Sequence, residues 1–505
     1  MDDGTRYVIQ ESNQALVGQH FVGGHVAYKL NSSKSYLKNN LSVNTSFPKN
    51  EGLVNDFVAQ TLSGHSFLLS NVMKANYKKK NGGVADLEWK ASFVDKRGVL
   101  NMSETNMSQL LRQRNFQSEA TGSLLAFTIP HLMFNLNGKV MFDWQRVSAG
   151  LNSLSDASGS EQKTWLLGAF VSPKILLHFG NRLQWLVYVP VGMKYYHSAD
   201  GSLDYDKRFF STCPYSNLTY KPTGRLSFDL TTICEESMPS VLSQMVLKHF
   251  VNYRTTMSNP YQVEIAPNRS VKLAFTSSYK DIIKMLFGGV TLSYVDARNG
   301  NSMGYQVVDD VVNYIVQPQS TKNRVWQIEQ TVAKGFFRWN SKISESLSVG
   351  TSRSEYYVGG DCHDGRSDYL QAKISYVASV RKWLNLSISN DYSVSKPYTD
   401  GKASGDVYRT FMNASSFTFW LGKQLNVVPS VQYYHNNYFS SGRNNVFLNT
   451  VMEYYWGNAT LSLKCTNLLD SRTFHRIIDN GITRYSGEYQ LRGRTILFGI
   501  RIKII

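Results

Sequence analysis

The chain alternates apolar and polar residues along much of its length. Near the C-terminus, the stretch "TILFGIRI" places Ile496, Phe498, Ile500 and Ile502 at every second position. Successive side chains of a β-strand point to opposite faces. One face of this segment is therefore hydrocarbon, and the other is mostly polar and basic. We predict a C-terminal strand with one apolar face.

The same two-residue period recurs upstream, for example in "ADLEWKASF" and "LNLSISNDYSVS". Several of these stretches reach about nine to twelve residues, whereas strands of soluble proteins usually have about five or six and bilayer-crossing strands need about nine to eleven. The length therefore favours strands that cross a membrane. The residues predicted to face lipid are Leu87, Trp89, Phe93, Leu384, Leu386, Ile388, Ile496, Phe498, Ile500 and Ile502.

Turn signals divide the alternating stretches. The predicted short turns are 135–139, 179–182 and 221–225, and the predicted long loops are 148–162, 198–207 and 398–406. Residues 239–250 read as either a loop helix or an irregular strand. Short turns at one end and long loops at the other are typical of outer-membrane barrels. We predict an all-β fold: a large antiparallel transmembrane β-barrel of about 18 to 22 strands, with short periplasmic turns and long extracellular loops.

Size and composition agree with this prediction. The chain has 505 residues and no linker-like segment, so we expect one barrel over residues 1–505. Charged residues make up 18%, below the usual quarter, and aromatic residues make up 13%. No run approaches the roughly 18 consecutive apolar residues of a membrane helix. The alternative is an array of soluble β-sandwiches, which would stay in buffer without detergent.

The formal net charge of +17 limits the partners. Nucleic-acid binding is one interpretation of such a charge. However, the basic residues are spread thinly, and their one cluster, "KKKNGG" at 78–83, looks like a turn. A basic lumen or contact with anionic lipid explains the charge equally well. We expect outer-membrane lipid as a partner and no nucleic acid.

The sequence offers little evidence of catalysis or metal binding. The four cysteines form no CxxC pair, and no GxSxG, HExxH or glycine-rich phosphate loop occurs. Cys362 lies in "GGDCHDGRSD", where a metal site and a solvated loop are both conceivable, and we favour the loop. We expect no catalytic residue, no metal, no cofactor and no enzymatic activity.

The end of the chain carries a more specific pattern. "TNLLDSRTF" is followed by "YQLRGRTILFGIRIKI". This pair resembles the C-terminal signature of TonB-dependent outer-membrane receptors, with Asn467–Asp470 matching its turn and Leu491, Arg492 and Arg494 matching the opening of the last strand. Gly493 departs from the pattern, because the family often has proline there. The stretches 34–43, 217–230, 252–254 and 333–339 look like large barrels of the Bacteroidetes type.

The resemblance implies active uptake of a nutrient across the outer membrane: an iron chelate, glycan, peptide or cofactor. A surface lipoprotein is a further partner that it suggests. The start of the chain already reads as barrel, and "MDDGTRYVIQ" is not a signal peptide. We expect the plug and any regulatory-like domain to lie outside this sequence, and the first strands are candidates to do so too. Contact with the TonB complex is expected through that missing N-terminal region.

Cations on the polar face are the candidate ligand-binding residues. Lys90, Lys373, Arg501 and Lys503 would suit an anionic ligand. Ordinary solvation of the lumen, with pairing to acids such as Glu88, is the alternative. For the whole chain, the alternative function is a passive channel, or a structural or secretion barrel, without TonB coupling.

Overall fold

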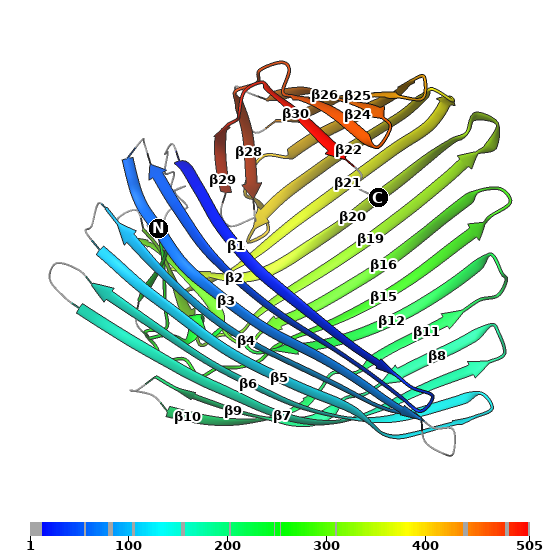
Figure 1. Ribbon diagram of the computed structural model, residues 1–505. Coiled ribbons are helices and arrows are strands. Elements are labelled where there is room, and N and C mark those ends of the chain that lie inside the picture. Colours follow the sequence, from blue (N-terminus) through cyan, green and yellow to red (C-terminus); the bar gives the residue numbers. More distant parts are fainter. Residues whose placement is uncertain are drawn as a thin grey trace.

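The chain folds into one large curved sheet (Figure 1). The computed structural model describes residues 13–54, 57–78, 84–103, 107–152, 157–200, 204–246, 248–252, 254–308, 311–437, 443–479 and 484–502. In these residues the sheet contains 28 strands, and a separate two-stranded sheet accompanies it. The predicted all-β antiparallel fold class is confirmed.

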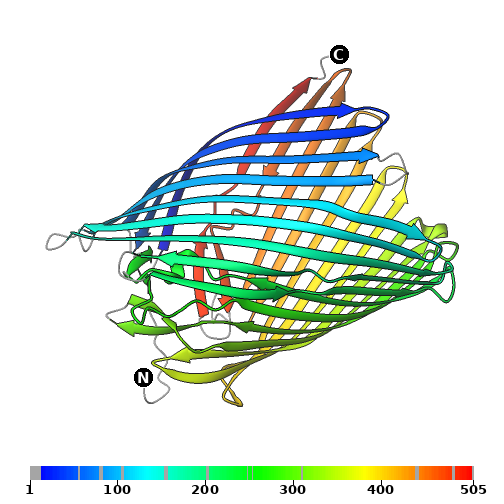
Figure 2. The ribbon, with the colours of Figure 1, turned by 90° about the horizontal axis from the view of Figure 1, so that it is seen from below.

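The first strands are long and pair in sequence order, as the side-by-side blue and cyan ribbons of Figure 2 show. They are β1 (Asn13–Asn31), β2 (Ser35–Val54), β3 (Phe57–Lys78), β4 (Val84–Met102), β5 (Met107–Ile129), β6 (Leu132–Asn152) and β7 (Ala157–Phe179). At 23 residues, β5 and β7 are about twice the predicted length. They therefore extend well beyond the roughly eleven residues that a bilayer requires.

The middle of the sheet is more interrupted. Its strands are β8 (Leu183–Tyr188), β9 (Val191–Ala199), β10 (Asp204–Thr212), β11 (Tyr215–Tyr220), β12 (Leu226–Ser237), β13 (His249–Asn252), β14 (Thr255–Ser258), β15 (Asn268–Asp281), β16 (Leu286–Asn299), β17 (Ser302–Val308) and β18 (Val311–Gln317). Both β8 and β9 pair with β7, so together they make one crossing of the sheet. Such breaks, together with short loop strands, raise the total above the predicted 18 to 22 or so.

The remaining strands return to regular antiparallel neighbours. They are β19 (Thr321–Phe336), β20 (Ser341–Val358), β21 (Asp361–Arg381), β22 (Leu384–Thr399), β23 (Lys402–Ala403), β24 (Tyr408–Leu421), β25 (Leu425–Asn436), β26 (Asn444–Trp456), β27 (Ala459–Thr466), β28 (Thr473–Asp479), β29 (Arg484–Gln490) and β30 (Thr495–Ile502). Both β1 and β30 end at the short-turn end of the sheet and therefore run in the same direction. Any hydrogen-bonded pairing between these two strands would be parallel. Within the described chain they form no such pair.

The register keeps one apolar face across neighbouring strands. Phe498 lies opposite Leu463, and Ile500 lies opposite Leu461. Leu386 lies opposite Phe417 in the same way. Because cross-strand partners share a face, the apolar sets merge into one continuous surface. The intervening residues form the polar face.

Some predicted turns are confirmed. The turns at 179–182 and 221–225 connect β7 to β8 and β11 to β12. Gly180 adopts φ 61°, a conformation that costs glycine little. The predicted loop at 398–406 lies almost wholly between β22 and β24, interrupted by the two residues of β23.

Other predicted turns are wrong. Residues 135–139 lie inside β6, which pairs along its length with β5; the chain turns instead near His131, at φ 71°. Most of 148–162 and 198–207 is strand as well, because polar residues here continue the ladders past the apolar band. Polarity marks solvent exposure, and a strand that extends beyond a membrane is polar on both faces without ceasing to be a strand.

Helix is scarce in this structure. Within 239–250 there is a single 3₁₀ turn, η1 (Val241–Gln244), followed by the start of β13. A second 3₁₀ turn, η2 (Phe337–Trp339), connects β19 to β20. Across the described ranges, no helix is both long and apolar enough to span a bilayer.

Candidate functional site

The connection between β12 and β15 folds across the inner face of the sheet. It leaves from β12, yet it packs against strands β5, β6, β7 and β9, none of which pairs with β12. Val241 and Met245 contact Val147 and Ala149, and all four side chains are buried. The side chains that it covers on β6, β7 and β9 alternate with exposed apolar ones such as Leu167 and Met193, so it lies on the face opposite the apolar surface. We call residues 238–267 the inner loop.

Hydrogen bonds fix the inner loop in place. Gln109 of β5 donates from Nε2 to the carbonyl of Phe250 at 2.8 Å and accepts the Phe250 N–H at 2.7 Å. The Tyr196 hydroxyl donates to Oε1 of Gln244 at 2.6 Å. The side chains of Gln109, Tyr196 and Gln244 are buried, so these bonds also satisfy polar groups that water hardly reaches. These bonds hold the described residues of the inner loop against β5 and β9.

A pocket of about 720 Å³ borders the inner loop. Ser237 and Asn268, which flank the loop, both line it. The charged side chains of its wall are Lys139, Lys194, Glu235, Glu236, Arg269 and Arg298. Cations outnumber carboxylates, so the pocket favours an anionic ligand.

Two facing strand breaks open this pocket. Pro190 separates β8 from β9, and Pro214 separates β10 from β11. The register brings the breaks side by side, since Thr212 lies opposite Val191 and Tyr215 lies opposite Tyr188. Proline cannot donate to a ladder. Both prolines can be found in the sequence. The strand register, however, determines that the two breaks lie next to each other.

A buried ion pair lies in the pocket wall. Lys194 Nζ is 2.6 Å from Glu236 Oε1, with side chains 9% and 2% exposed. Arg269 Nε contacts the second oxygen of Glu236 at 2.9 Å, and its side chain is 58% exposed. Glu236 therefore holds the Arg269 side chain at the pocket, and Lys194 neutralises the negative charge of Glu236. The sequence analysis did not single out these three residues.

The cations that the sequence proposed for ligand binding lie elsewhere. Lys90 pairs with Glu88 at 3.3 Å, Lys373 lies opposite Asp391 in the ladder, and Arg501 lies opposite Thr460. The pocket lining includes none of these three. Lys503 lies outside the described residues. Their binding role stays a prediction, and the structure does not bring them together.

The residues predicted to face lipid lie on the apolar face. Five are exposed: Leu87, Ile496, Phe498, Ile500 and Ile502. The other five are half-buried among their neighbours: Trp89, Phe93, Leu384, Leu386 and Ile388. Trp89 Nε1 donates to Ser118 Oγ at 3.0 Å, which satisfies its polar edge. Contact with lipid stays a prediction for all ten.

Exposed aromatic side chains gather beside the short turns. They are Phe179, Tyr220, Phe337, Trp339, Trp383 and Trp456. Aromatic rings are enriched where hydrocarbon meets water at a membrane surface. Their place at the turn ends of strands matches such a boundary.

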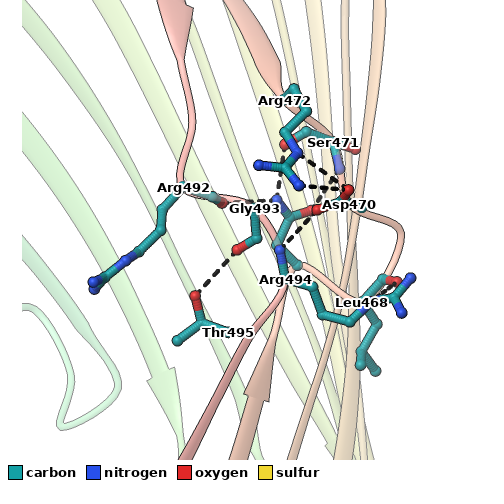
Figure 3. A network of polar contacts seen from close by, with 9 residues as sticks. Leu468, Asp470, Ser471, Arg472, Arg492, Gly493, Arg494 and Thr495 are labelled. Carbon is teal, nitrogen blue, oxygen red and sulfur yellow. Dashed lines mark hydrogen bonds and ion pairs between the residues drawn. The ribbon is translucent and has the colours of Figure 1, made fainter.

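The C-terminal motif folds into a compact polar network (Figure 3). Asn467 donates from Nδ2 to the carbonyls of Ser471 and Arg492, at 2.8 and 3.0 Å, and accepts the Ser471 N–H at 2.9 Å. Asp470 accepts the backbone N–H of Arg494 at 2.9 Å. The motif thus joins the turn after β27 to the start of β30, across residues far apart in sequence.

The stretch around Cys362 is the start of a strand, so the loop predicted there is wrong. It opens β21, after a turn at Gly359 and Gly360. His363 contacts Asp400 at 2.8 Å. Among the residues that the structure describes, no group of three or more potential metal ligands comes together.

No protein-family model and no curated protein sequence match this chain. Solved structures do. The Pseudomonas aeruginosa protein FpvA, bound to a pyoverdine–iron complex, is 10% identical with a TM-score of 0.55, over 97% of this chain and 65% of FpvA. The ferric citrate transporter FecA is 10% identical with a TM-score of 0.52, over 98% and 79%. The copper transporter OprC is 10% identical with a TM-score of 0.50, over 97% and 81%.

The chain shares its large β-barrel fold with FpvA, FecA and OprC. This is the fold that the resemblance to TonB-dependent receptors implies. At about 10% identity the likeness concerns the fold. The chain spans about two thirds of FpvA and about four fifths of FecA and OprC.

Proposed function

We propose that this chain is the barrel of an outer-membrane receptor that takes up a nutrient with energy supplied through TonB. The apolar face would contact lipid, and the exposed aromatics beside the short turns would mark the periplasmic boundary. The long-loop end, which carries the inner loop, would then face outward. A surface lipoprotein that delivers the nutrient is a partner compatible with this orientation.

The observation that carries the proposal is the pocket beside the inner loop. A barrel of this width is too wide for wall side chains to fill. Here the inner loop crosses the inner face, and a pocket of about 720 Å³ in which cations predominate lies where the strands that flank this loop meet the wall. The names of the similar structures mention a pyoverdine–iron complex for FpvA, ferric citrate for FecA and copper for OprC. An anionic metal chelate fits both the charge and the fold.

Uptake of radiolabelled iron by the native organism tests the function. Cells with and without the gene are given a panel of anionic ferric chelates, with and without an uncoupler of the proton gradient. We expect saturable uptake of at least one chelate that is lost with the gene and abolished by the uncoupler. Uptake that rises linearly with concentration and ignores the uncoupler would establish a passive channel instead.

Binding to the purified protein tests the pocket separately. Arg298→Glu should weaken binding of the transported chelate about tenfold, because one charge-assisted contact becomes a repulsion. Arg182→Glu, in the turn between β7 and β8, makes the same charge change away from the pocket. Equal effects of the two variants would rule out this pocket as the binding site.

A further inference from the structure

A row of arginines crosses three strands on the outer face. Arg324 of β19 lies directly opposite Arg353 of β20, and Arg353 lies opposite Arg366 of β21. All three side chains are exposed. Arg324 is two positions from Trp326 and therefore shares its apolar face. The row lies near the long-loop end, where β19 begins and β20 ends.

Such a row is unfavourable without a counter-ion. Like charges directly opposite in a ladder destabilise it. Asp296 contacts Arg324 at 3.4 Å, and Asp368 contacts Arg366 at 2.7 Å. Lys396 then adds another cation beside the row: it lies opposite Asp368, and both Lys396 and Arg366 are 5.2 Å from the Tyr398 ring. Cations remain in excess over carboxylates.

An apolar groove of about 920 Å³ lies next to this row on the same face. Leu292, Trp326, Ile328, Val349 and Leu370 line it, and Lys396 and Asp368 lie at its polar end. Trp326 is 58% exposed. On each of the three strands the groove lining begins two residues from the arginine, at Trp326, Thr351 and Asp368. The hydrocarbon groove and the cationic row therefore form one amphipathic site.

A second place on the outer face repeats the charge arrangement. Arg114 of β5 lies opposite Arg146 of β6, and Arg146 lies opposite Lys163 of β7. Glu161 contacts both Arg146 and Lys163, at 2.6 and 2.7 Å. These cations also lie toward the long-loop end. One ligand chemistry therefore suits two separate places around the barrel.

We propose that Arg324, Arg353 and Arg366 bind the phosphate groups of a phosphorylated outer-leaflet lipid whose acyl chains occupy the adjacent groove. The guanidinium groups present paired donors to phosphate oxygens, and the phosphates neutralise the row. A free phosphate would leave the groove empty, whereas a lipid uses both halves of the site. The inference rests on the outer-membrane placement proposed above, but it does not depend on uptake.

Native mass spectrometry of the full chain in mild detergent tests this site. The probes are a diphosphorylated glycolipid and the same lipid after phosphatase treatment. Wild-type protein should retain the phosphorylated form at least about tenfold more strongly. Arg324→Gln/Arg353→Gln/Arg366→Gln should lower the number of phosphorylated lipids retained per protein by one, and any preference that remains should be lost when Arg114→Gln/Arg146→Gln/Lys163→Gln is added. The control Lys272→Gln/Lys280→Gln/Lys342→Gln removes three exposed cations from the polar face and should behave as wild type.

Three results would overturn the proposal: equal retention of both lipids by the wild type, an equal loss in the control, or displacement of the lipid by millimolar inorganic phosphate. Retained mobility of the folded barrel on unheated gels shows that the arginine variant still folds. This experiment measures no transport. The lipid-binding proposal can therefore be confirmed when the uptake proposal is contradicted, and the uptake proposal can be confirmed when lipid binding is contradicted.

Discussion

The backbone N–H of Arg494 donates to Oδ1 of Asp470 at 2.9 Å, and Arg472 contacts the other carboxylate oxygen at 2.9 Å. Gly493 lies against this ion pair: a Cβ placed there would be 2.5 Å from Arg472 Cζ and 2.6 Å from Asp470 Oδ1. The pair thus occupies the space that a proline ring would need. This accounts for glycine where related motifs often carry proline.

Gly493→Pro should therefore destabilise the barrel, because the ring collides with Arg472 and Asp470. Combining it with Arg472→Ala should restore some of the loss, since the nearest colliding side chain is then gone. Thermal unfolding in detergent, followed as the loss of the fast-migrating folded band, measures both. A double variant no more stable than Gly493→Pro alone would contradict this explanation.

Asn467→Ala should destabilise the same region. Three hydrogen bonds of the Asn467 side chain are lost, which at roughly 0.5 to 1.5 kcal/mol each predicts a loss of about 1.5 to 4.5 kcal/mol. Asn467 also holds φ 54°, where alanine is strained. Asn467→Gly relieves the strain but not the lost bonds. Urea unfolding should therefore place the glycine variant between wild type and alanine, and a glycine variant equal to wild type would contradict the hydrogen-bond assignment.

The motif should loosen in acid. The Arg494 N–H and the Arg472 guanidinium hold the pKa of Asp470 below its usual value of 3.8. A lowered pKa in the folded state means that the carboxylate stabilises the fold at pH values above 3.8, and that this contribution is lost as the pH falls through the lower folded value. Hydrogen exchange at the Arg494 amide, corrected for intrinsic rates, should rise over that range. Asp470→Asn should show no such step.

Breaking the buried pair in the pocket wall should be costly. Glu236→Gln leaves Lys194 without its charge partner, and removal of one member of a buried pair costs about 3 to 5 kcal/mol. Lys194→Met/Glu236→Gln removes both charges and should recover most of the loss. Denaturant midpoints compare the three proteins. A single variant that matches wild type would show that the pair is solvated.

The dispersed cations of the polar face provide a separate test. If they bind the ligand as the sequence analysis predicted, Lys90→Gln and Lys373→Gln should each weaken chelate binding about threefold, as expected for loss of one exposed charge contact. If they are ordinary lumen solvation, both variants should bind as wild type. Lys342→Gln, an exposed lysine near the short-turn end of β20, is the matched control.

Local pattern predicted the strands well where one face was apolar. The period at Leu384–Ile388 and at Ile496–Ile502 gave the correct strands and faces, because alternation is a direct consequence of strand geometry. It failed at 148–162, where β6 and β7 continue in polar sequence. There the ladder hydrogen bonds come from the neighbouring strand, and no residue of the segment reveals them.

The candidate pocket could not be predicted from the sequence, for a related reason. Pro190 and Pro214 each predict a strand break, but nothing local indicates that the breaks adjoin. Likewise Lys194 and Glu236 are 42 residues apart and look like ordinary charged residues. Charged residues acquire a role through their partners, and the partners are set by register.

The sequence by itself determined the strands, the two faces and the class of fold, because these follow from side-chain alternation and from the composition of one chain. The tertiary structure decided where the inner loop crosses, which cations meet at the pocket, and that Arg324, Arg353 and Arg366 form one row. Those features arise from pairing between distant strands, where a shift of one residue would turn every side chain to the other face.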